Sequence, residues 1–292
     1  MSASRAPHAN PLRHVDGRVL ALRALFGSIG HLAPGPAARI AEGIFCRPPR
    51  HEMRPGELDF LATGTPFTVI VDGQTIAAWR WGTGPRVLLM HGWGSRASRF
   101  RHFVPPLLEA GFGVVALDGP GHGRTGGTRA SLPQFAAALT AVVREVDGVA
   151  GAIGHSLGGA ALLFAMSRGV PPVPAVTISA PAEPAAYFDR FARHLHLPRS
   201  VRTRIQRSLE QRFRLAWRDL HMPDVVARHP APLLVVHDVD DHDVPLTDGY
   251  ALADAAPRGR LLETTGLGHR AIMRDRGVVR DAVAFLVEHV PR

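Results

Sequence analysis

A short run in the middle of the chain constrains the fold more than any other feature. Gly154-His155-Ser156-Leu157-Gly158-Gly159 reads G-x-S-x-G and lies between two apolar segments, 149–153 and 160–166. The first segment is typical of a buried strand and the second of a helix, so the pattern predicts a strand, a tight turn and a helix. Glycines on both sides let the strand and the helix approach closely, and the serine takes a strained backbone conformation. A plain glycine-rich turn has the same pattern, so other motifs in the chain are needed to distinguish the two interpretations.

From residue 67 onwards, strand-like and helix-like segments alternate along the chain. Asp72-Gly73, between the segments 67–71 and 75–81, is typical of a two-residue hairpin turn. The alternation predicts an α/β fold with a mostly parallel sheet, helices on both faces and an antiparallel hairpin at one edge. The later expected strands are 86–90, 112–117, 149–153, 173–179, 232–237 and 260–264, and the later expected helices are 97–110, 132–146, 160–166, 246–255 and 278–289.

Two parts of the chain interrupt this alternation. Residues 1–60 carry apolar residues at helical spacing from 15 to 29, then Pro34-Gly35-Pro36, then a second short helical segment at 37–45. We expect an N-terminal helical extension packed on a main domain of residues 61–292, in preference to a lid or a membrane-surface element. Residues 181–228 hold several short helical patterns, and we expect them to form a small helical cap inserted before the strand 232–237.

The composition is that of a globular protein with a sizeable core, at 292 residues, 46% apolar and 20% charged. No apolar run approaches the length of a membrane span. The net charge of +9 suggests nucleic-acid binding, but all 34 basic residues are arginines and most are scattered along the chain. The denser group at 199–218 is typical of a solvated helix face, and no recognisable nucleic-acid module is present. We therefore expect no nucleic-acid partner.

The cysteine count and the first residues of the sequence indicate the cellular compartment. Cys46 is the only cysteine, so no internal disulfide forms, which is compatible with a reducing compartment. Residues 1–10 are mixed in character, and Arg18 and Arg23 break the apolar stretch 15–26, which does not match a signal peptide. We expect a cytoplasmic protein without a transmembrane segment, in preference to a protein in peripheral contact with a membrane. The sequence indicates nothing about the oligomeric state.

Candidate partners for the serine follow the last two expected strands. A serine hydroxyl is a poor nucleophile until a base takes its proton, and an acid must orient that base. His269, in Gly266-Leu267-Gly268-His269, follows the last expected strand. The loop after the strand before it offers four acids, which are Asp238, Asp240, Asp241 and Asp243.

The same acidic loop also contains His237 and His242, and a cluster of His and Asp residues suggests a metal site. The loop does not match the calcium loop of an EF-hand, because Asp243 occupies the place where that loop needs glycine. We expect neither a metal nor another cofactor.

The order serine, aspartate, histidine, each after an expected strand, resembles the α/β-hydrolase superfamily. Two glycine-rich runs add to the resemblance. His91-Gly92-Trp93-Gly94 is similar to the His-Gly-x motif of that family, and residues 118–124 (DGPGHGR) resemble a second family signature, which we interpret as a structural loop. The resemblance extends from about residue 67 to the end of the sequence and leaves residues 1–60 outside it.

The resemblance assigns roles to particular residues. It implies that Ser156 is the nucleophile and that His269 is the base. Family members commonly carry the acid four residues before the proline of a Val-Pro pair, which selects Asp241, with Asp240 as the runner-up. Asp238 is assigned to the turn, and it departs from the family because many members have glycine there.

The resemblance also implies an oxyanion hole, a pair of amides that stabilise the negative charge of a tetrahedral intermediate. The expected donors are the backbone amides of Leu157 and Trp93. Residues 181–228 are expected to lie over this site as the cap. His155 is the variable position of the G-x-S-x-G run, and we expect its side chain to point away from Ser156.

These assignments predict a cofactor-independent serine hydrolase that acts on a small-molecule carboxylic ester or thioester. A carbon–carbon bond hydrolase, a peptidase and a lyase are alternatives that use the same triad, because fold analogy does not separate them. A non-catalytic receptor for a small ligand is a further alternative. The sequence does not specify the substrate or the length of its acyl chain.

Overall fold

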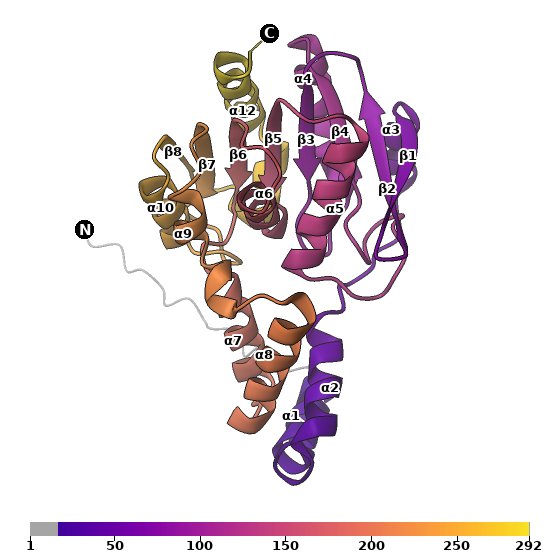
Figure 1. The fold of residues 1–292 in the computed structure, drawn as a ribbon, viewed down its shortest axis with the longest axis vertical. Coiled ribbons are helices and arrows are strands. Elements are labelled where there is room, and N and C mark those ends of the chain that lie inside the picture. Colours follow the sequence, from indigo (N-terminus) through magenta and orange to yellow (C-terminus); the bar gives the residue numbers. More distant parts are fainter. Residues whose placement is uncertain (1–16, 292) are drawn as a thin grey trace, which may run out of the picture.

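An eight-stranded sheet runs through the centre of the computed structural model, which describes residues 17–291 (Figure 1). The strand order is β1-β2-β4-β3-β5-β6-β7-β8, with antiparallel pairing at β1–β2 and β2–β4 and parallel pairing elsewhere. The expected α/β fold, a mostly parallel sheet with an antiparallel hairpin at one edge, is confirmed. The strands are β1 (Thr65–Val71), β2 (Gln74–Trp81), β3 (Arg86–Met90), β4 (Gly113–Leu117), β5 (Gly151–His155), β6 (Ala175–Ile178), β7 (Leu233–Asp238) and β8 (Gly259–Thr264).

The edge hairpin forms where the sequence predicts it. Asp72 and Gly73 both have positive φ, 49° and 75°, which is the conformation of a type I′ turn. Such a turn matches the twist of the two strands that it joins, and β1 pairs with β2 along the whole length of β1.

Each face of the sheet carries its own apolar core. Successive side chains of a strand point to opposite faces, so Leu88 joins one core and Leu89 the other. Residues of β4, β5, β6 and β7 are buried throughout, as expected of parallel strands covered on both sides. One face is covered by the helices α5 (Leu132–Glu145), α6 (Leu157–Ser167), α9 (Met222–Val226) and α10 (Leu246–Ala255). The other face is covered by the helices α3 (Pro55–Ala62), α4 (Val104–Glu109) and α12 (Arg276–His289) and by the 3-10 turns η1 (Ala97–His102) and η3 (Ile272–Arg274).

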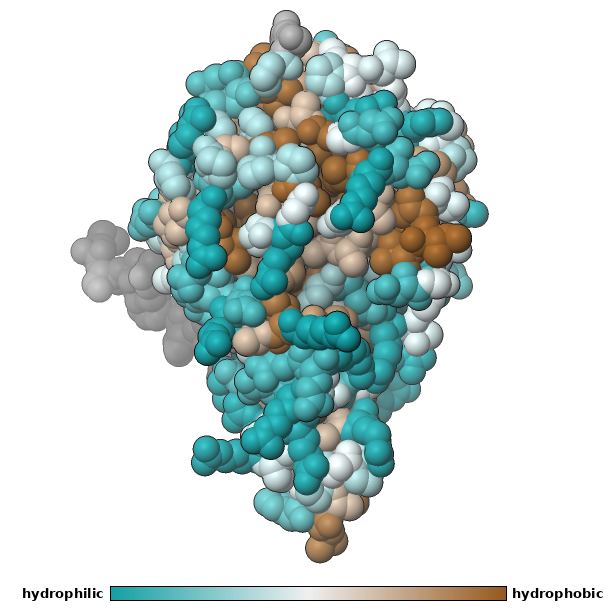
Figure 2. All heavy atoms as spheres, in the orientation of Figure 1, coloured by the Kyte–Doolittle hydropathy of each residue, from teal (hydrophilic) through white to brown (hydrophobic). Residues whose placement is uncertain are grey.

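Four helices form a projection below the sheet in Figure 1. They are α1 (Gly17–Leu32), α2 (Pro34–Phe45), α7 (Pro184–His194) and α8 (Arg199–Phe213). Their buried side chains, among them Phe26, Phe188 and Ile205, form a third core separate from the two cores of the sheet. Figure 2 shows mainly hydrophilic side chains over this projection, except at its apolar tip. Within residues 17–291 no helix is both long and apolar enough to cross a membrane.

The two irregular parts of the sequence therefore meet in space. Helices α1 and α2 come from the expected extension, and α7 and α8 come from the expected cap. The insertion also supplies η2 (Trp217–Leu220) and α9, and α9 packs against α6 and α10. Residues 1–16 of the extension lie outside the described residues. The expected boundary after residue 60 falls inside α3, whose Leu61 belongs to a core of the sheet.

We expect Phe26→Ala to loosen the projection and leave the sheet intact. Phe26 is fully buried among the four helices, and truncation of a buried Phe typically costs about 3–5 kcal/mol. Hydrogen exchange followed by mass spectrometry should show faster exchange in α1, α2, α7 and α8 but not in β3–β7. Leu20→Ala is the control, because Leu20 of the same helix is 54% exposed. Equal exchange in both variants would contradict the prediction.

Candidate active site

Ser156 lies in the turn between β5 and α6, and its backbone is strained. Its φ of 52° and ψ of −128° are rare for a residue with a side chain. Its amide donates to the carbonyl of Ile178 in β6 at 2.8 Å, which ties the turn to the neighbouring strand. A Cβ on Gly158 would lie 2.3 Å from the carbonyl oxygen of His91, and a Cβ on Gly154 would lie 2.5 Å from the backbone of α6. The close approach of strand, helix and loop therefore requires glycine at both positions.

One chain of hydrogen bonds joins Ser156, His269 and Asp241. His269 Nε2 lies 3.0 Å from Ser156 Oγ, and His269 Nδ1 lies 2.8 Å from Asp241 Oδ2. Since a carboxylate only accepts, Nδ1 carries the proton and Nε2 is free to accept the serine proton. The other oxygen of Asp241 accepts the amides of Asp243 and Val244, both at 2.9 Å. These bonds fix the direction of the carboxylate that holds the imidazole.

The side chain of Asp241 is buried, and burial by itself raises the pKa of a carboxyl group. Hydrogen bonds from His269 and from the amide of Val244, together with the charge of the imidazole, outweigh this effect and lower the pKa of Asp241 to about 2. The carboxylate is therefore ionised at neutral pH and able to stabilise a protonated His269.

The other acids of the loop do not contact His269. Asp240 accepts the amide of Gly266 at 2.8 Å, and Asp238 accepts donors from its own turn and from the loop before His269. Of the two candidates for the acid, the structure brings Asp241 and not Asp240 to the imidazole. In the part of the chain that is described, no group of three or more His, Cys, Asp or Glu side chains is placed to hold a metal ion.

The two expected oxyanion donors lie on either side of the serine. A Cβ on Gly92 would be 2.8 Å from Ser156 Cβ, so the loop 91–94 lies directly against the serine. Leu157 begins α6, where backbone amides have no partner within the helix and the helix dipole is positive. Among residues 17–291, the amides of Trp93 and Leu157 donate to no protein acceptor. Both are therefore free to bind an acceptor on a ligand.

Two buried histidines hold the loop 91–94 against the loop 118–124. Nε2 of His91 accepts the amide of Gly119, and Nε2 of His122 accepts the amide of Gly94, both at 2.9 Å. In each ring Nδ1 donates to a nearby backbone carbonyl. These bonds need neutral imidazoles. Burial lowers the pKa of His122 to about 4 and that of His91 well below its ordinary value.

The side chain of Asp118 stabilises the loop 118–124 by hydrogen bonds. Its carboxylate accepts the amides of Ala97 and Arg124, both at 2.7 Å, and it is fully buried. Burial raises the pKa of Asp118 to about 6, although the two amides oppose the rise. The contacts agree with the interpretation of the 118–124 run as a structural loop.

His155 makes a contact that the sequence analysis did not identify. Its Nε2 lies 2.8 Å from the backbone oxygen of His269, and the two rings are 4.8 Å apart. Burial, with the charge of His269 as a smaller cause, lowers the pKa of His155 to about 3, so the ring is a neutral donor to that carbonyl. The two residues are far apart in the chain, and no local pattern signals the contact.

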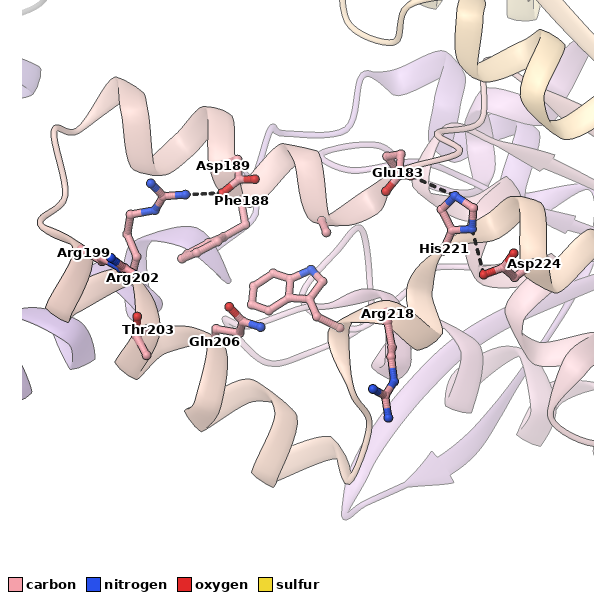
Figure 3. Close-up of a pocket in the computed structure, with 12 residues that line it drawn as sticks. Glu183, Phe188, Asp189, Arg199, Arg202, Thr203, Gln206, Arg218, His221 and Asp224 are labelled. Atoms are coloured by element: carbon pink, nitrogen blue, oxygen red, sulfur yellow. Dashed lines mark hydrogen bonds and ion pairs between the residues drawn. The ribbon is translucent and has the colours of Figure 1, made fainter.

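A separate cavity of about 700 Å³ lies among α7, α8, η2 and α9 (Figure 3). Phe188 and Trp217 pack against each other in its wall, with ring centroids 4.9 Å apart. His221 lies between Glu183 and Asp224, 3.0 Å from each carboxylate. Neither Ser156 nor its hydrogen-bonded partners line this cavity, so it is distinct from the candidate active site.

Comparison with known proteins gives matches to hydrolases. A family model described as serine aminopeptidase, S33, matches residues 84–231, about half of the chain. A monoacylglycerol lipase of Mycolicibacterium smegmatis is 27% identical, over 73% of this chain and 92% of that protein. The structure of Rv0554 from Mycobacterium tuberculosis has a TM-score of 0.62 at 21% identity, covering 78% of this chain and 100% of that chain. Esterase RhEst1 from Rhodococcus sp. ECU1013 has a TM-score of 0.58 at 19% identity, covering 77% and 98%. At such identities the two structures show the fold alone.

We expect the free energy of unfolding to fall as the pH is lowered from about 6.5 towards 4. His91, His122 and His155 are neutral in the folded protein because their pKa values are lowered, whereas the unfolded chain takes up their protons near pH 6.5. Asp118 and Asp248, whose pKa values are raised, act in the opposite direction. The pKa values of His102 and His229 are lowered as well, so the groups with the destabilising effect at low pH outnumber these two carboxyls. Urea unfolding at about pH 7 and about pH 5 should give the lower free energy at the acidic pH.

His122→Gln provides the control for this measurement. The variant lacks one of the three histidines, so its difference in unfolding free energy between the two pH values should be smaller than that of the native protein. An unfolding free energy that is the same at both pH values would contradict the prediction.

Proposed function

We propose that this chain, which belongs to the α/β-hydrolase superfamily and to the family described as serine aminopeptidase, S33, is a serine hydrolase that cleaves a carboxylic ester or thioester. The observation that carries the proposal is the unbroken hydrogen-bond chain from Asp241 through His269 to Ser156. The free amides of Trp93 and Leu157 beside the serine add to it. The name of the similar monoacylglycerol lipase supports an ester as substrate.

In the proposed reaction Ser156 Oγ attacks the carbonyl carbon of the substrate while His269 Nε2 takes the hydroxyl proton. The carbonyl oxygen becomes an oxyanion and accepts hydrogen bonds from the amides of Trp93 and Leu157. When the tetrahedral intermediate collapses, His269 donates its proton to the leaving alcohol or thiol, and the acyl group stays on Ser156. Water then attacks the acyl-enzyme by the same route and releases the acid. Asp241 keeps the imidazole oriented and stabilises its charge in both halves.

We also propose that the helices from residues 181–228 act as the cap of this site. The hydroxyl of Tyr187 and the guanidinium of Arg190, both in α7, each donate to the carbonyl of Asp243 at 3.3 Å. The Arg190 guanidinium lies over the Tyr187 ring, 4.0 Å from its centroid. These contacts support the proposal because they join the start of the insertion to the loop that carries Asp241.

We expect hydrolysis of p-nitrophenyl esters, from acetyl to palmitoyl, by the native protein but not by Ser156→Ala. The variant lacks the nucleophile, so its rate should match that of buffer, while its circular dichroism should match the native spectrum. The chain length with the highest kcat/KM would indicate the size of the acyl pocket. Ester activity retained in the variant would contradict the assignment of Ser156. Activity on aminoacyl arylamides in place of esters would favour the peptidase alternative, which the family description suggests.

A second comparison tests which aspartate orients His269. Asp241→Asn should lower kcat about 10⁴-fold, the size of the effect known for the same change in a Ser-His-Asp enzyme, because asparagine favours the wrong tautomer of His269. Asp240→Asn is the matched control and should change kcat by no more than a few-fold, because Asp240 does not contact the imidazole. A larger loss of kcat in Asp240→Asn than in Asp241→Asn would reverse the assignment.

A further inference from the structure

The turn before His269 has an unusual backbone. Gly266 and Gly268 have φ values of 78° and 60°, whereas Leu267 between them has φ −95° and ψ −36°. Residues that alternate between left-handed and right-handed conformations direct their successive N–H groups to one side, which forms a concave site for an anion. The turn 266–268 therefore offers converging amides.

The anion that occupies this concavity is a side chain of the protein itself. Asp238, the last residue of β7, accepts the amide of Gly268 at 2.8 Å and the amide of Leu267 at 3.1 Å. It also accepts the hydroxyl of Thr264 at 2.7 Å and the amide of Asp240 at 3.0 Å. Each carboxylate oxygen thus accepts two hydrogen bonds. One partner lies in the turn that carries Asp241, one at the end of β8, and two in the loop between β8 and His269.

The environment keeps Asp238 charged. Its side chain is fully buried, and burial raises the pKa of a carboxyl group. The four hydrogen bonds to the ionised form outweigh burial and hold the pKa of Asp238 below its ordinary value. The hydrogen bonds are therefore charge-assisted and stronger than those between neutral groups.

We propose that Asp238 is a positioning residue, whose buried carboxylate fixes the backbone of residues 264–268 and so places His269 between Asp241 and Ser156. The inference rests on the proposed function of these three residues. Asp238 contacts neither the imidazole nor the serine, and it acts only through the loop. A glycine, which many α/β-hydrolases carry at this position, has no side chain to accept these amides. The geometry matters because a displacement of about 1 Å between reacting groups can lower a rate about 100-fold.

The test uses a fluorophosphonate probe, which reports the reactivity of the serine without knowledge of the substrate. Asp238→Asn keeps the shape of the side chain, but its NH₂ group accepts no amide proton and its charge is lost. We expect the rate constant for labelling of Ser156 to fall about 10- to 100-fold. With the best ester, kcat should fall by a similar factor and KM should stay the same. A labelling rate within about threefold of native would overturn the proposal.

Asp240→Asn is the matched control. The carboxylate of the exposed Asp240 accepts one hydrogen bond from the same turn, from the amide of Gly266, and the change removes this charged acceptor. Its labelling rate should stay within about threefold of native, as for most substitutions of exposed residues. A loss as large as that in Asp238→Asn would mean that any bond to the turn has the same effect, which would overturn the particular role of Asp238.

A double-mutant cycle separates positioning from general loosening of the site. If Asp238 acts through His269, then Asp238→Asn should not lower the residual labelling rate of His269→Ala any further. A further loss of tenfold or so would show an effect on the nucleophile or the oxyanion amides and would overturn the proposal. If Ser156 of the native protein is not labelled at all, the proposed function fails and the inference fails with it.

Thr264→Val keeps the proposal testable if Asp238→Asn does not fold. The change removes one of the four donors at a partly exposed position and leaves the carboxylate in place. We expect a smaller fall in the labelling rate, about three- to tenfold, again with an unchanged KM. An unchanged labelling rate in a folded Thr264→Val would overturn the proposal.

Discussion

The close backbone approach at the turn between β5 and α6 is the constraint on which the site depends. Only glycine fits at 154 and 158, because a Cβ at either position would overlap backbone atoms. The approach lifts Ser156 out of the sheet in a strained conformation and brings the loop 91–94 against it. The free amides of Trp93 and Leu157 and the hydrogen bond from Ser156 to His269 follow from this one arrangement.

Buried polar groups hold the surrounding loops, and their charge states are matched to their partners. His91, His122 and His155 are neutral and bind backbone groups, while Asp238 and Asp241 are ionised and accept several donors each. Burial alone would disfavour every one of the charged forms, so the ionised carboxylates persist only where amides and hydroxyls surround them. Hydrogen bonds to buried polar side chains thus help to fix these loops.

Most of the sheet was predictable, because its strands carry local signals. The strand 86–90 is observed with the same bounds, and the Asp72-Gly73 hairpin forms as expected. Helix α3 was not predicted. It is only eight residues long, and it is held by contacts such as that between the buried Glu57 and Arg96, which lie 39 positions apart. The meeting of α1 and α2 with α8 was not predictable either, because amphipathic patterns show that a face is buried but not against what.

For the candidate site, the residue types, their order and their places at the ends of strands were predictable from the sequence. Ser156 and His269 stood out because each follows a strand-like run. Four aspartates within six positions carry no local signal that separates them, and a register borrowed from related proteins selected Asp241. Which carboxylate contacts His269, and which one accepts the amides of its loop, became clear only from the arrangement of the folded chain. Hydrogen bonds from the end of β7 and from the loop that follows it reach residues after β8 that lie 28 to 30 positions further along the chain. Their distances and angles depend on how two strands and two turns are placed in space.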